Sequence, residues 1–166
     1  FSVSGLDRAL YSAFANAPAY ITEPVPPGTF YRLGDSVRLT LVRGAVVTGT
    51  VTNASGEPMS GVYIRATRIR DANGQPTRTA SFSQETSDDR GVYRIYGLQG
   101  GIYVISAGGW GCFFANFNPY DSDVPPFSPA ATRDTATEFT LRPGEETTAD
   151  IRYRGEQGYT LSGTVK

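Results

Sequence analysis

The sequence of 166 residues contains no histidine. A zinc site with histidine ligands, and every catalytic dyad or triad that uses an imidazole base, are therefore excluded within this chain. Lys166 is the only lysine, and all other cationic side chains are arginines. An isopeptide bond between lysine and asparagine is therefore excluded within residues 45 to 154, although Lys166 is available to bond to another copy.

Cysteine and long apolar runs are also scarce. Cys112 is the only cysteine, so no disulfide forms within the chain, and we interpret it as a buried thiol or a bridge to another chain. Apolar runs such as Ala45 to Val47 fall far short of the ~20 residues that span a bilayer, so we expect no membrane span. The formal charge is −1, with no run of Lys or Arg, which argues against nucleic acid as a partner.

Turn-forming and aromatic residues are abundant instead, with 19 Gly, 11 Pro, ten Tyr and nine Phe. Apolar and polar residues alternate in short segments, the two-residue period of half-buried strands. The predicted strands span residues 47–52, 62–67, 78–85, 92–96, 102–107, 137–141 and 147–153, and turns such as NASGEP, DANGQP and SDDRG separate several of them. This pattern predicts an all-β, antiparallel β-sandwich. A short helix is expected over residues 6–15, with Leu6, Leu10 and Phe14 on one face.

The two ends of the sequence resemble each other in one consistent order. FSVSG, FANAP, VPPGTF and TFYRLGDS near the start match YVISA, FANFNP, VPPF and EFTLRPGEE, and VRG and VTGTV match YRG and LSGTV. The period is roughly 100 to 115 residues, typical of one domain in a tandem array. We therefore predict a complete repeat at 45–154, the closing part of a preceding repeat at 1–44, and the opening strand of another at 155–166, so that both ends are incomplete repeats.

VTGTVTNASGEPMSGVYIRA followed by TSDDRGVYRIYGLQGGIYVISA resembles the carboxypeptidase regulatory-like domain. Ser87 precedes the motif's aspartate, and Gln99 and Gly100 fill a position often held by prolines, which are mild departures. The resemblance implies a transthyretin-like, Ig-like β-sandwich, of the kind found in tandem in large secreted or surface bacterial proteins. It implies an extracellular accessory domain without the peptidase metal centre, hence no enzymatic activity and no cofactor.

Carboxylates in turns are the weakest candidates for chemistry. Calcium needs six to eight converging oxygens, and the spacing of Asp71, Asn73, Asp88, Asp89, Asp121 and Asp123 matches no known calcium loop. We interpret these side chains as turn formers. A pair of carboxylates for glycoside hydrolysis is not indicated either, because most of the 16 acids lie in turns.

An aromatic loop spans residues 110 to 127. It contains Trp110, Phe113, Phe114, Phe117, Tyr120 and Phe127 among glycines and prolines. These rings are candidates for a cap on the open end of the sandwich, for a protein interface, or for a platform that stacks on a polysaccharide. Asn53 begins an N-x-S sequon in a turn and is a candidate for glycosylation.

The C-terminal strand is the candidate donor of a subunit contact, through Tyr159, Leu161, Gly163 and Val165. Unpaired strand edges recruit further strands. We therefore expect the C-terminal strand of one chain to complete the N-terminal partial repeat, or an exposed sheet edge, of the next chain. Such head-to-tail self-association builds a filament or surface fibre, because the contact need not close. The alternatives are a spacer repeat of a long surface protein and a carbohydrate-binding module that uses the aromatic loop.

Overall fold

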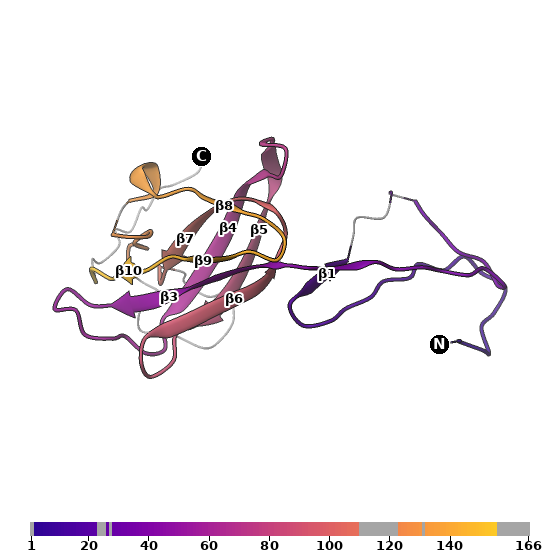
Figure 1. Cartoon of the computed structure of the whole chain (residues 1–166), viewed down its shortest axis with the longest axis horizontal. Helices are drawn as coiled ribbons and strands as arrows, with labels where there is room; N and C mark the ends of the chain where they lie inside the picture. The colour runs from indigo at the N-terminus through magenta and orange to yellow at the C-terminus, as the bar shows by residue number, and fades with distance from the viewer. Residues whose placement is uncertain (1, 23–25, 27, 110–122, 131, 156–166) are drawn as a thin grey trace, which may run out of the picture.

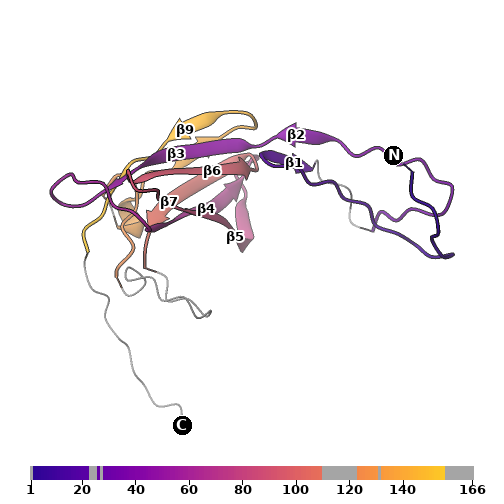
Figure 2. The same ribbon diagram turned by 90° about the horizontal axis from the view of Figure 1, so that it is seen from below.

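The structure, a computed structural model, describes residues 2–22, 26, 28–109, 123–130 and 132–155. It confirms the all-β prediction: the only helical turn among the described residues is a 3₁₀ turn, η1 (Arg133–Thr135). Two sheets form a sandwich, and an extended arm built from residues 2–43 projects from one end of it (Figures 1 and 2).

One sheet of the sandwich is antiparallel throughout, in the order β5-β4-β7-β8. Its strands are β4 (Tyr63–Asp71), β5 (Pro76–Thr86), β7 (Gly101–Ala107) and β8 (Phe139–Leu141). The alternation in β4 buries Ile64 and Ala66 completely, because successive side chains of a strand point to opposite faces. This sheet therefore supplies one side of the core.

The second sheet is centred on β3 (Ala45–Thr52), which pairs antiparallel with β6 (Val92–Leu98). On its other edge, β3 pairs in parallel with β9 (Glu146–Thr148) and β10 (Ile151–Arg152). This edge is a parallel exception in the otherwise antiparallel sandwich. The single strand expected over 147–153 is also divided, because the Asp150 carboxylate accepts the hydrogen bond from the Thr50 N–H (2.8 Å) in place of a backbone carbonyl.

The core lies between the two sheets and includes aromatic side chains whose polar ends are satisfied. Tyr93 is 2% exposed, and its hydroxyl donates a hydrogen bond to the carbonyl of Ala149. The hydroxyl of Tyr103, another core residue, donates to the carbonyl of Gln99 (2.9 Å). Buried hydroxyls need such partners, since an unpaired one is costly to bury.

Three turns of the sandwich repeat the same hydrogen bonds. Each begins at Asn53, Asp71 or Asp88, whose side-chain oxygen accepts from the backbone N–H groups two and four residues later, at 2.8 to 3.0 Å. A glycine with positive φ follows at the fourth position in every case, at Gly56, Gly74 and Gly91. The carboxylates of Asp71 and Asp88 are turn formers, as the sequence indicates.

The arm is a narrow two-stranded ladder. Its paired strands are β1 (Tyr20–Thr22) and β2 (Leu41–Arg43), which are antiparallel, and an isolated bridge joins Tyr11 to Tyr31 further out. The helix expected over residues 6–15 does not form. A helix of about ten residues is marginal without tertiary packing, and the described part of the chain offers this segment no second layer against which an apolar helical face could pack.

Candidate functional site: an arm with exposed apolar side chains

The arm concentrates the exposed apolar side chains of the molecule. Of the eleven large hydrophobic side chains that are exposed among the described residues, eight belong to the arm. They are Val3, Leu6, Leu10, Phe14, Tyr20, Phe30, Leu33 and Val37. Exposed apolar surface that gathers in one region typically marks an interaction site.

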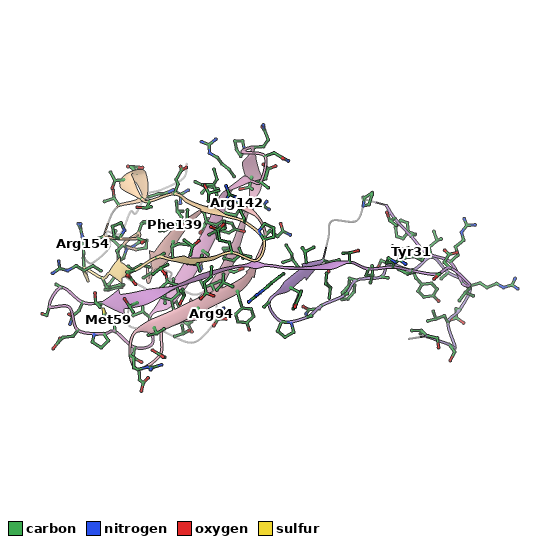
Figure 3. The ribbon with its side chains drawn as sticks, in the orientation of Figure 1. Tyr31, Met59, Arg94, Phe139, Arg142 and Arg154 are labelled. Atoms are coloured by element: carbon green, nitrogen blue, oxygen red, sulfur yellow. The ribbon has the colours of Figure 1, made fainter. Side chains whose placement is uncertain are left out.

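The shape of the arm explains this exposure. Among the described residues, the ladder is two chains wide and has no second layer (Figure 2). Many of its apolar side chains therefore meet solvent. Phe14 is the extreme case, with 83% of its surface exposed. Tyr31, which forms a bridge with Tyr11, lies in the outer part of the arm, far from the sandwich (Figure 3).

The base of the arm is fixed closely to the sandwich. Gly44 is buried between β2 and β3, and its N–H donates to the carbonyl of Ala19 (2.8 Å). A Cβ atom added at Gly44 would lie 2.6 Å from the Cα of Gly97, at the end of β6. Beside this contact, Ile21 and Phe82 line a small recess. The base of the arm is therefore packed and hydrogen-bonded against the second sheet, and β2 leads directly into β3.

β1 and β2 each keep one edge without a strand partner among the described residues, because they form a two-stranded sheet of their own. Such an edge presents backbone N–H and C=O groups in the pattern that pairs with another strand. The structure thus combines an available strand edge with exposed apolar side chains on the same arm. This combination suits a contact with an added β-strand.

Most of the other predicted site residues lie outside the described part of the chain. Tyr159, Leu161, Gly163 and Val165, and the aromatic residues Trp110, Phe113, Phe114, Phe117 and Tyr120, lie outside the described residues, as does Cys112. These predictions stay predictions.

Phe127, which ends the aromatic loop, is described and is only 7% exposed. It forms a bridge with Ser106 of β7, so it belongs to the buried interior and cannot serve as a ring of an exposed platform. Nearby, the hydroxyl of Tyr153 donates to the carboxylate of Asp123 (2.8 Å), which ties the chain just before Phe127 to the end of the second sheet. For this one ring, the structure favours the interpretation as a cap.

Asn53 has its side chain engaged in its own turn. Its Oδ1 accepts from the N–H groups of Ser55 and Glu57 (both 2.9 Å), and its Nδ2 donates to the Glu57 carboxylate (2.8 Å). A glycan on Nδ2 would have to replace the contact with Glu57. Glycosylation at this position remains a prediction.

The ionisable groups with shifted pKa values have structural roles. The pKa of Asp88 is lowered, chiefly because its carboxylate accepts the hydrogen bond of the Val92 N–H. Burial raises the pKa of Tyr93 far above its ordinary value and that of Tyr103 in the same direction. Among the described residues, no three carboxylate or thiol side chains lie together as metal ligands.

The sequence analysis expected an acceptor in the N-terminal partial repeat but predicted no strand at β2. The signal for it is the alternation of Val37, Leu39 and Leu41 with polar residues, which is the pattern of a strand with one apolar face. That pattern shows a strand but not whether its edge is covered. The latter depends on neighbours that only the three-dimensional arrangement reveals.

Comparisons with known proteins add little to this geometry. No protein-family model matches the chain, and no curated protein matches its sequence, so membership of the carboxypeptidase regulatory-like family stays a prediction. Among solved structures, the chain is similar to the major pilin subunit of Bacillus cereus, with 15% identity and a TM-score of 0.32. That match covers 81% of this chain but 41% of the pilin chain, and a superposition this weak defines no shared topology or function. No helix in the described part of the chain is long and apolar enough to cross a membrane.

Proposed function

We propose that this chain is a non-enzymatic, extracellular structural protein that self-associates head to tail by β-strand complementation and builds a filament or surface fibre. The observation that carries the proposal is the arm, in which an unpartnered strand edge and exposed apolar side chains occur together. Such an edge gains hydrogen bonds and apolar burial when another strand adds to it.

The contact proposed here is heterologous, because one subunit contributes the arm and another contributes its C-terminal strand. Heterologous contacts that do not close into a ring extend without limit. An elongated subunit with its arm at one end favours this open arrangement (Figure 1). The carboxypeptidase regulatory-like resemblance supports the extracellular location.

The test is the assembly state of the purified 166-residue chain, observed by negative-stain electron microscopy, with and without residues 159–166. We expect filaments from the full chain and monomers from the truncated chain. Monomers in both preparations would refute self-assembly and favour a spacer repeat in a longer protein. Circular dichroism of both chains controls for folding, since the truncated residues follow β10, the last strand among the described residues.

A further inference from the structure

Two turns of the chain share the same hydrogen bonds, although they lie in different parts of the molecule. In the arm, the Asp35 N–H donates to the carbonyl of Arg32 (3.1 Å), and the Arg32 N–H donates to the Asp35 carboxylate (2.7 Å). In the sandwich, Glu145 and Arg142 make the same two bonds, at 3.0 and 3.3 Å. The glycine at the third position of each turn has a positive φ, 89° and 78°. The arm therefore reproduces the turn between β8 and β9, where Arg142 lies (Figure 3), at a separation of 110 residues.

This separation of 110 residues also relates the strands that follow the two turns. It makes Leu41, the first residue of β2, equivalent to Ile151, the first residue of β10. Leu39 is likewise equivalent to Ala149. Both Ala149 and Ile151 are buried in the core, where they are 2% and 1% exposed. The apolar face of the arm is therefore equivalent to a face that is buried in the sandwich.

The direction of the backbone N–H groups agrees with this equivalence. In the sandwich, the Arg152 N–H donates to the carbonyl of Pro129 (2.8 Å), on the side away from β3. The N–H of the next residue, Tyr153, donates to the carbonyl of Thr52 at the end of β3 (2.7 Å). Neighbouring N–H groups of this segment thus point to opposite sides, and one side belongs to β3.

In the arm, the N–H of Gly44 donates towards β1, to Ala19 (2.8 Å). Because N–H groups alternate along a strand, that of Val42 also faces β1, while those of Leu41 and Arg43 face the other edge. Val42 and Arg43 are the equivalents of Arg152 and Tyr153. The edge of β2 that faces away from β1 is therefore the equivalent of the edge that β3 covers in the sandwich.

The C-terminal segment carries the sequence of β3. LSGTV at residues 161–165 matches VTGTV at residues 47–51. In β3, Gly49 lies so close to the segment between β9 and β10 that an added Cβ would be 2.3 Å from the carbonyl oxygen of Ala149. Gly163 keeps a glycine at the matching position. The segment therefore has the residue type that this close parallel pairing requires.

We propose that residues 159–166 of a second copy pair in parallel with the outer edge of β2, with Val165 opposite Leu41. This inference rests on the proposed function and specifies its contact. The register follows from the sandwich, where Val51 is opposite Ile151 and Val47 is opposite Thr147. It also places Leu161 opposite Val37, so that an apolar side chain of the donor covers one that is exposed in the arm.

The donor must belong to a second copy because the chain's own C-terminus cannot reach. The chain runs extended from Val37 through β2 and β3 to Thr52 (Figure 1), a span of about 50 Å at ~3.3 Å per residue. Tyr153 is hydrogen-bonded at Thr52, and the eight residues from there to Leu161 cover about 29 Å at most when fully extended. Pairing within one molecule in this register is therefore excluded.

The test is disulfide trapping between two different variants, each with Cys112 replaced by serine. One carries Leu41→Cys and the other carries Val165→Cys, so that any mixed disulfide joins two molecules. The matched control replaces the donor variant with Thr164→Cys, whose side chain points to the opposite face in this register. Under mild oxidation we expect a covalent dimer from the Val165 pair, at a yield about tenfold above that of the Thr164 pair, because a disulfide needs Cβ atoms about 4 Å apart that point towards each other, and the Cβ of residue 164 lies on the other face.

The outcomes separate this inference from the proposed function. Filaments on the microscope grid together with equal yields from the two pairs, or with no dimer, would overturn the register while self-assembly stands. Chains that are folded by circular dichroism but form neither filaments nor dimers would refute both. Dimers from the Val165 pair that disappear when wild-type chain is added in excess support the contact, since an unlabelled donor competes for the same edge.

Discussion

Gly49 lies where the parallel edge of the second sheet comes closest to β3, and its replacement tests the packing of the sandwich. An added Cβ would lie 2.3 Å from the carbonyl oxygen of Ala149 and 3.0 Å from the Cε1 atom of Tyr93. The oxygen is backbone, and it already accepts the hydrogen bond of the Tyr93 hydroxyl. The N–H of Ala149 donates to Thr48 (2.8 Å), so the segment cannot retreat without losing a second hydrogen bond.

We therefore expect Gly49→Ala to lower the free energy of unfolding by about 3 kcal/mol, the upper part of the range for overpacking. For a chain of this length, that loss corresponds to a fall in Tm of about 6 to 12 °C. Thermal unfolding followed by circular dichroism measures it. The control is Gly100→Ala, where the nearest atom to the added Cβ is a side-chain carbon of Pro143 at 3.3 Å, and we expect a loss below about 1 kcal/mol. Equal Tm values for the two variants would refute the argument.

Three further substitutions test other parts of the structure. Tyr93→Phe leaves the Ala149 carbonyl without the Tyr93 hydroxyl as its donor, so we expect a loss of about 1 to 3 kcal/mol in urea unfolding, together with the disappearance of a late-ionising phenol from the alkaline absorbance titration; an unchanged urea midpoint would contradict this. The lowered pKa of Asp88 means that its carboxylate stabilises the fold above the ordinary value of 3.8 and that this contribution is lost as the pH falls below it. Asp88→Asn keeps the acceptor oxygen that Asn53 uses in the same kind of turn. Between neutral pH and about pH 3, we therefore expect the free energy of unfolding to fall less in this variant than in the wild type. Identical acid profiles of the two proteins would contradict a stabilising role for the Asp88 carboxylate. Phe14→Ser removes the most exposed aromatic side chain of the arm, 83% exposed; its effect on Tm should correspond to less than about 0.5 kcal/mol, while filament yield falls, and a lowered Tm with unchanged filaments would be the opposite result.

Local chemistry made most of the sandwich predictable. Apolar and polar residues alternate along β3 and β4 because one face of each strand is buried, and this alternation is visible in the sequence. The turns were equally accessible, because Asn53, Asp71 and Asp88 each stand three residues before a glycine. A side-chain oxygen that accepts backbone N–H groups and a glycine that accepts positive φ together determine such a turn without help from the rest of the fold.

The errors arose where pairing depends on distant residues. Nothing in residues 146 to 152 distinguishes a strand that pairs in parallel with β3 from one that pairs antiparallel, because either arrangement buries the same alternate side chains. The helix expected over residues 6–15 failed for a related reason. Its apolar spacing was adequate, but a helix needs a surface against which to pack, and the arm provides none. For the candidate site, the sequence indicated the donor strand and the N-terminal partial repeat as its acceptor. It did not indicate which strand edge of that repeat is open, because an open edge is defined by a missing neighbour, which no residue of β2 encodes.

Hydrogen-bond direction decides the register between the arm and the sandwich, which sequence similarity leaves open. The match of VRG with YRG implies a separation of 111 residues, whereas the turns and the strand starts imply 110. A difference of one residue reverses which side chains and N–H groups face the open edge. At 111, Leu41 would correspond to the exposed Arg152, and the Val42 N–H, which faces β1, would correspond to that of Tyr153, which faces β3. Only the separation of 110 keeps the apolar face of the arm equivalent to the core face of the sandwich, and only that separation makes the N–H groups of Leu41 and Arg43, which face away from β1, equivalent to those that face β3.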